Sequence, residues 1–143
     1  MLNASISPWP SFTDEEANRV RDIIMSNRVN YWTGDEGRQF EREFAGWSGS
    51  AHAIALANGT LALDLALKAL GIGPGDEVVV TPRTFIASVS TVVNAGAIPV
   101  FADVDADSGN ISPATIAPIL SERTRAIIPV HLYGQPVDLA GVL

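Results

Sequence analysis

A small polar triplet, Asn58-Gly59-Thr60, stands where an apolar run of the sequence meets a helix-like run with no linker between them. The first amides of a helix have no acceptor inside the helix and carry the positive end of its dipole. Gly59 would let a ligand approach the backbone closely, and Thr60 would add a hydroxyl donor. The triplet therefore predicts a small cup for an anion such as a phosphate. Plain capping of the helix by Asn58 or Thr60 would explain the same residues without a ligand.

A second group that could contact a ligand follows the next apolar run. The strand expected at residues 77–81 leads through Pro82-Arg83-Thr84 to Phe85. Ligands of open parallel sheets bind beyond the carboxyl ends of the strands, so Phe85 is expected to face the crevice of Gly59 and Thr60 if the two strands are neighbours. An anion cup beside an aromatic ring suits a planar, phosphorylated, heteroaromatic ligand. The alternative is that Phe85 packs in the core.

The elements that must position these residues follow from the spacing of apolar residues. Helices are expected at residues 13–26, with Thr13 and Glu16 as a capping box, and at 36–47, 60–70, 85–95 and 113–120. Strands are expected at 52–57, 77–81, 98–102 and 125–130. Continuously apolar strands are typical of parallel strands buried on both faces. The predicted fold class is therefore α/β, a mostly parallel sheet covered by helices on both faces.

Composition excludes several classes of function. The 143 residues carry a net charge of −7, which argues against a nucleic-acid partner, and no cysteine, which excludes a disulfide framework. No apolar run is long enough to span a membrane, and the first residues lack the features of a secretory signal, so a cytoplasmic location is expected. No metal site is expected. The segment DVDADSGN at 103–110 hints at a calcium loop, but the required Gly and Glu are replaced by Ser108 and Ala114, so a polar turn is predicted.

From residues 31–34 onward, the sequence resembles the DegT/DnrJ/EryC1/StrS family of pyridoxal-phosphate-dependent aminotransferases, which act on nucleotide-linked keto-sugars and have the fold-type I aminotransferase fold. The resemblance is carried by Gly59-Thr60, GIGPGDEV at 71–78, Thr84-Phe85 and PVHLYGQP at 129–136. It implies an N-terminal portion of such an enzyme. Residues 1–50 would form a helical segment, and 51–143 would form the first part of the cofactor-binding α/β domain, truncated at its C-terminal end.

The resemblance also implies roles for single residues. Gly59, Thr60 and Leu61 would hold the phosphate of pyridoxal 5'-phosphate, the latter two mainly through backbone N–H groups. Phe85 would stack on the pyridine ring. Two positions depart from the family pattern: Asn58 replaces a residue that is often Ser, and Arg83 stands where many relatives carry a smaller or aromatic residue, which affects the expected substrate contacts. His131, near Tyr133 and Gln135, fits either the substrate side of the crevice or a structural turn.

No catalytic residue is predicted within the chain. The Schiff-base lysine and the acid beside the pyridine nitrogen are expected beyond Leu143, so the chain is expected to be inactive alone. The only lysine, Lys68, is expected to pair with Asp64 on the surface of its helix.

The function implied for the full-length protein is transfer of an amino group, with glutamate as the expected donor, to a nucleotide-linked keto-deoxysugar. Such a reaction would serve cell-surface polysaccharide or sugar biosynthesis. A homodimer is expected from the resemblance and from Trp9, Trp32 and Trp47 near the N-terminus. Two alternatives stay open: a pyridoxal-phosphate-dependent sugar dehydratase of the same family, and a non-catalytic domain that binds a phosphate ligand or is purely structural.

Overall fold

The computed structural model describes residues 8–143, which divide into two compact units. The first unit ends at Ala55 and the second is Leu56–Leu143. The boundary expected after residue 50 lies inside the first unit. Within the described residues, no helix combines the length and the apolar character needed to cross a membrane.

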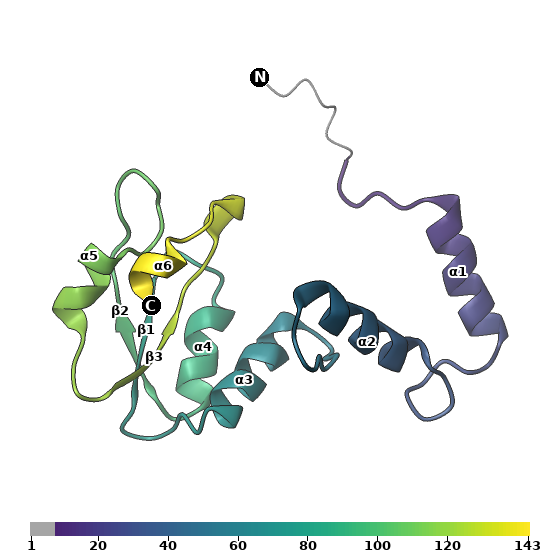
Figure 1. The fold of residues 1–143 in the computed structure, drawn as a ribbon, viewed down its shortest axis with the longest axis horizontal. Helices are drawn as coiled ribbons and strands as arrows, with labels where there is room; N and C mark the ends of the chain where they lie inside the picture. Colours follow the sequence, from purple (N-terminus) through teal and green to yellow (C-terminus); the bar gives the residue numbers. More distant parts are fainter. Residues whose placement is uncertain (1–7) are drawn as a thin grey trace. The chain divides into compact units, whose positions relative to one another are not determined.

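The first unit contains the two predicted helices, α1 (Asp14–Met25) and α2 (Glu36–Ser48) (Figure 1). The predicted capping box of α1 is confirmed. The Thr13 amide donates to Glu16 Oε2 over 2.7 Å, and the Glu16 amide donates to Thr13 Oγ1 over 3.3 Å. The hydrogen bonds from Thr13 also lower the pKa of the Glu16 carboxyl. On α2, helical spacing brings the Phe40 and Phe44 rings to a centroid distance of 5.7 Å.

The strand predicted at residues 52–57 is wrong. These residues form neither a helix nor a strand, and Ile54 and Leu56 are exposed. A strand requires a neighbour that accepts and donates its backbone hydrogen bonds. Within the described residues, the only three strands pair with one another, and none pairs with this segment. The segment is apolar, as the sequence shows, but no described strand pairs with it.

The second unit is built on a parallel sheet in the order β2-β1-β3. Its strands are β1 (Glu77–Val80), β2 (Ile98–Phe101) and β3 (Thr124–Ile128). All three confirm predicted strands, and the parallel pairing confirms the predicted fold class. β1 lies in the centre and is buried along its whole length, as expected for a continuously apolar strand.

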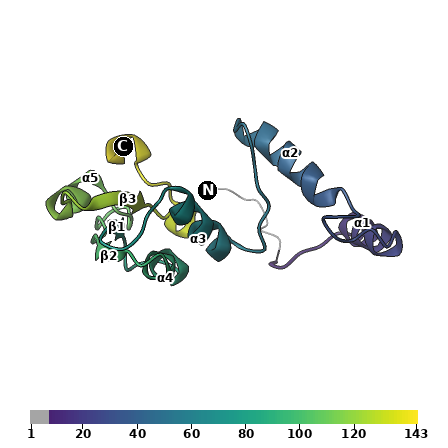
Figure 2. The same cartoon turned by 90° about the horizontal axis from the view of Figure 1, so that it is seen from below.

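Helices cover both faces of this sheet (Figures 1 and 2). One face carries α3 (Gly59–Ala69) and α4 (Ala87–Asn94), and the other carries α5 (Pro113–Ile116) with a 3-10 turn (Ala117–Ile119) and the short α6 (Leu139–Val142). A second 3-10 turn, Leu132–Gly134, lies between β3 and α6. The helix predicted at 113–120 is shorter than expected, because α5 ends at Ile116, before Pro118. The helix predicted from residue 85 begins two residues later, at Ala87.

Two hydrophobic clusters hold the layers together, one on each face of the sheet. Val78 packs with Leu67 of α3 and Val92 of α4, whereas Val79 packs with Ile111 and Ile116 on the opposite face. Successive strand residues point to opposite faces, so the two neighbouring valines anchor the two helical layers. This packing fixes the position of α3 on the sheet. Because α3 ends in the turn that leads into the start of β1, its first turn lies toward the carboxyl ends of the strands.

Candidate functional site

Two backbone donors in the first turn of α3 have no acceptor among the described residues. Asn58 caps the helix: its Oδ1 accepts the Leu61 amide over 3.0 Å, and its carbonyl accepts the Ala62 amide over 3.2 Å. Of the two residues considered as caps, Asn58 therefore caps the helix. Among residues 8–143, the amides of Gly59 and Thr60 have no hydrogen-bond acceptor. Capping thus leaves these two amides at the positive end of the helix dipole.

The space above these amides is open. A Cβ built on Gly59 would meet no heavy atom of the described residues within 4 Å, apart from its chain neighbours and the backbone of its own helix. Thr60 is partly buried beside it and can add its hydroxyl. Two outward amides, a hydroxyl and free space at a helix N-terminus fit a phosphate group. Leu61, the third residue expected to contribute, has its amide engaged by Asn58 in this structure.

Phe85 lies just before α4, at the carboxyl end of β1. Its carbonyl accepts the Ser88 amide over 3.1 Å, and its side chain is 72% exposed. The alternative that Phe85 packs in the core is therefore wrong. Because its ring is exposed, Phe85 is available to pack against a planar ligand.

Lys68 lies at the other end of α3 from the open amides. Nine residues separate it from Gly59, which corresponds to roughly 14 Å at a rise of about 1.5 Å per residue. The predicted ion pair with Asp64 is wrong, since none of the ion pairs among the described residues joins the two side chains. Exposed pairs on a helix gain little because both charges are well solvated.

The polar turn predicted at residues 103–110 is present. Asp105 Oδ1 accepts the amides of Ser108 and Asp107 over 2.9 and 3.1 Å. These bonds, with that from Ser108 the stronger cause, lower the pKa of the Asp105 carboxyl. The carboxylate therefore closes its own turn.

Asn110, which the sequence analysis did not single out, organises the segment after β3. It is buried, its Nδ2 donates to the Gln135 carbonyl over 2.9 Å, and its Oδ1 accepts the Leu132 amide over 3.3 Å. His131 contributes to the same segment, because its Nδ1 accepts the Val137 amide over 3.0 Å. These contacts give His131 a structural part in the turn. A single Asn in a polar run carries no sequence signal for such a role.

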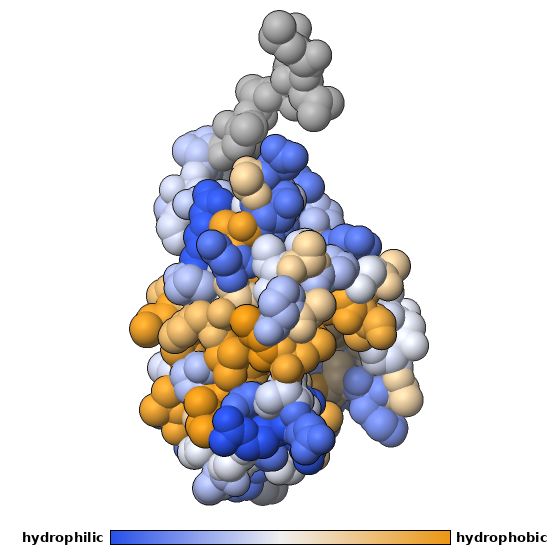
Figure 3. Space-filling view, turned by 90° about the vertical axis from the view of Figure 1, so that its left-hand side faces the viewer, coloured by the Kyte–Doolittle hydropathy of each residue, from blue (hydrophilic) through white to orange (hydrophobic). Residues whose placement is uncertain are grey.

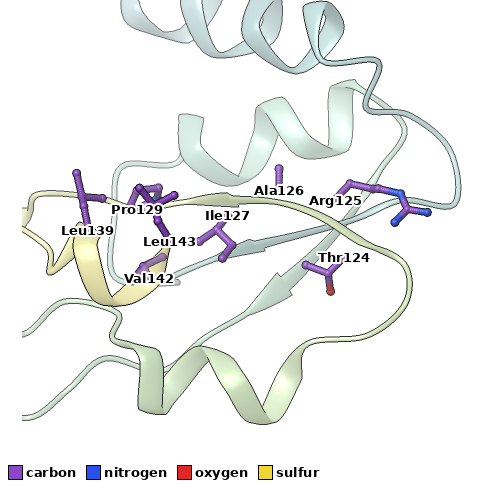
Figure 4. Close-up of a pocket in the computed structure, with 8 residues that line it drawn as sticks. All are labelled: Thr124, Arg125, Ala126, Ile127, Pro129, Leu139, Val142 and Leu143. Carbon is purple, nitrogen blue, oxygen red and sulfur yellow. The ribbon is translucent and has the colours of Figure 1, made fainter.

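A hollow of about 330 Å³ lies between β3 and α6 (Figure 4). Its lining is mostly apolar, with Ile127, Pro129 and Val142 among the contributors. Of its polar lining residues, Arg125 is paired with Asp76 over 3.7 Å. None of the predicted site residues lines this hollow, and its side chains offer little chemistry.

Comparison with known proteins identifies the family of this chain. The model of the DegT/DnrJ/EryC1/StrS aminotransferase family matches residues 10–143. Among curated proteins, the chain is 53% identical over 130 residues to UDP-N-acetyl-3-dehydro-alpha-D-glucosamine 3-aminotransferase of Acidithiobacillus ferrooxidans, a match that covers 87% of this chain and 35% of the relative. The chain thus spans about a third of the length of the relatives that it matches.

Solved structures show the same fold. An aminotransferase from Psychrobacter cryohalolentis superposes with a TM-score of 0.92 at 62% identity, covering 96% of this chain and 35% of that one. A putative sugar aminotransferase from Streptococcus pneumoniae in its PLP form superposes with a TM-score of 0.86 at 34% identity, covering 98% and 35% of the two chains. From the match over residues 10–143, the chain belongs to the DegT/DnrJ/EryC1/StrS aminotransferase family.

Proposed function

We propose that this chain supplies the phosphate site of a pyridoxal-phosphate-dependent aminotransferase. The observation that carries the proposal is the pair of free amides at Gly59 and Thr60, with open space above them, in a chain of this family. Relatives named for transfer to a UDP-linked glucosamine and for synthesis of GDP-perosamine support a nucleotide-linked keto-sugar as acceptor. The amino donor is proposed to be glutamate.

In this proposal, the residues of the chain bind and orient the cofactor. The amides of Gly59 and Thr60 and the Thr60 hydroxyl hold its phosphate, and Phe85 covers one face of its ring. Leu61 joins them only where the Asn58 side chain releases its amide. When bound, pyridoxal phosphate supplies an electron sink for amino transfer. The lysine that binds it covalently is proposed to lie outside this chain, because Lys68 sits at the far end of α3.

Replacing Thr60 with valine is expected to weaken cofactor binding. The change removes one hydroxyl donor to a charged phosphate, worth about 1.5–3 kcal/mol, so the dissociation constant should rise about tenfold to a hundredfold. Thr60→Ser keeps the hydroxyl and should bind like the parent. The measurement is a fluorescence titration of the full-length gene product with pyridoxal 5'-phosphate. Equal affinities for Thr60→Val and the parent would show that the Thr60 hydroxyl does not bind the phosphate.

We also propose that the full-length protein is a homodimer. Hydrophobic side chains are exposed at the surface (Figure 3), and Trp9, Trp32 and Trp47 of the first unit are 94%, 88% and 82% exposed. Aromatic residues are enriched in subunit interfaces, so these indoles support burial against a second copy of the chain. Light scattering of the full-length gene product is expected to give twice the mass of one chain. A monomer across the accessible concentration range would contradict the proposal.

A further inference from the structure

Arg83 leaves the carboxyl end of the central strand β1 and reaches the turn that follows the neighbouring strand β2. Its amide donates to Thr81 Oγ1 over 3.1 Å, and Thr81 is buried, so the backbone is held at this point. Its guanidinium lies against Gly109 in the turn at 103–110. The side chain therefore reaches from the segment after β1 to the turn after β2, and ligands of parallel sheets bind beyond the carboxyl ends of the strands.

Gly109 leaves the space that the guanidinium fills. A Cβ at this position would lie 2.5 Å from Arg83 Nη1 and 3.4 Å from Arg83 Cζ. Gly109 also has a φ of +68°, in the left-handed region that favours glycine. The close approach of Arg83 and the positive φ both favour glycine at position 109.

The guanidinium of Arg83 has no ion-pair or hydrogen-bond partner among residues 8–143. Four other arginines each have a carboxylate within 4.0 Å: Arg19, Arg42, Arg123 and Arg125. Arg83 has neither such a partner nor a side-chain hydrogen bond, although the adjacent turn contains Asp105. As described above, the Asp105 carboxylate accepts amides of its own turn. A guanidinium with five N–H donors, two residues from the exposed Phe85, is thus left available for a ligand.

We propose that Arg83 binds an oxyanion of the substrate beside the cofactor site. Guanidinium binds carboxylate and phosphate groups through two parallel hydrogen bonds, so the ligand class is a group with paired oxygens. The two sources in this reaction are the carboxylate of an amino-acid donor and the phosphates of a nucleotide-linked sugar. The inference rests on the proposed function, and it assigns Arg83 to the substrate and the first turn of α3 to the phosphate of the cofactor.

Calorimetric titration of the full-length gene product with two probes, glutarate and inorganic pyrophosphate, tests this inference. Each titration is run with and without saturating pyridoxal 5'-phosphate. Arg83→Gln is expected to weaken binding of at least one probe about tenfold to a hundredfold, the range of a charge-assisted hydrogen bond. Arg83→Lys should recover part of that loss. Arg21→Gln, which removes an exposed arginine of α1, should bind like the parent.

The outcomes separate the two sources and the two proposals. Loss of glutarate binding alone assigns Arg83 to a carboxylate, loss of pyrophosphate binding alone assigns it to a phosphate, and loss of both assigns a general oxyanion site. The inference is overturned if the parent binds neither probe, if Arg83→Gln binds both as the parent does, or if its affinity for pyridoxal 5'-phosphate falls together with that for the probes. A parent that binds a probe through Arg83 but not the cofactor would contradict the proposed function only.

Discussion

Replacing Gly59 with valine is expected to raise the dissociation constant for pyridoxal 5'-phosphate by more than about a hundredfold. The side chain would occupy the space above the free amides and keep the phosphate from both of them, and each charge-assisted bond is worth about 1.5–3 kcal/mol. The fold should be unaffected, because among the described residues a Cβ at Gly59 meets nothing within 4 Å beyond its chain neighbours and its own helix backbone. The readout is a cofactor titration of the full-length gene product, with circular dichroism to verify folding.

A matched control for this substitution is Gly46→Val on α2. By the same measure, a Cβ at Gly46 has no contact within 4 Å among the described residues either, so this change adds the same side chain at a helix position of the first unit, outside the first turn of α3. It should leave cofactor binding unchanged. If Gly59→Val held the cofactor as tightly as this control, the first turn of α3 would be only a capped helix end.

The largest expected loss of stability comes from Leu67→Ala. Leu67 is 3% exposed and is the single buried residue of α3, where it packs with Val78 and Val92. Removing a buried leucine leaves a cavity and costs about 2–5 kcal/mol of unfolding free energy. Because this contact also anchors the helix that carries Gly59 and Thr60, cofactor binding should weaken with it.

Leu70→Ala provides the comparison for this second prediction. Leu70 follows α3 directly and is 71% exposed, so its truncation should change the unfolding free energy by less than about 0.5 kcal/mol. Urea unfolding of the two variants and the parent measures the difference. Similar losses for Leu67→Ala and Leu70→Ala would show that Leu67 is not the contact that holds α3 on the sheet.

The sequence predicted those elements whose formation depends on local chemistry or on complete burial. The capping box of Thr13 and Glu16 requires only residues three apart, and β1 was recognisable because both faces of a central parallel strand are covered. The segment at 52–57 has a similar apolar composition, yet it has no pairing partner among the described residues. Apolar composition does not specify hydrogen-bond pairing, which depends on residues distant in the sequence, and Ile54 and Leu56 remain exposed. This explains why the strand prediction failed.

The candidate site shows the same division. The free amides of Gly59 and Thr60 follow from helix geometry and could be predicted, as could capping by Asn58. The contact of Arg83 with Gly109 could not be predicted. It joins the segment after β1 to the turn after β2 and depends on a left-handed backbone at the glycine. The absence of an ion pair between Asp64 and Lys68 could not be predicted either. An ion pair at this spacing on an exposed helix face stabilises the helix by only about 0.2–0.5 kcal/mol.

The most direct test of the phosphate site is a crystal structure of the full-length gene product with pyridoxal 5'-phosphate. Phosphate oxygens are expected at hydrogen-bonding distance, about 2.7–3.2 Å, from the amide nitrogens of Gly59 and Thr60, with the Phe85 ring against the pyridine ring. A structure in which the phosphate binds elsewhere, while these two amides face only water, would contradict it.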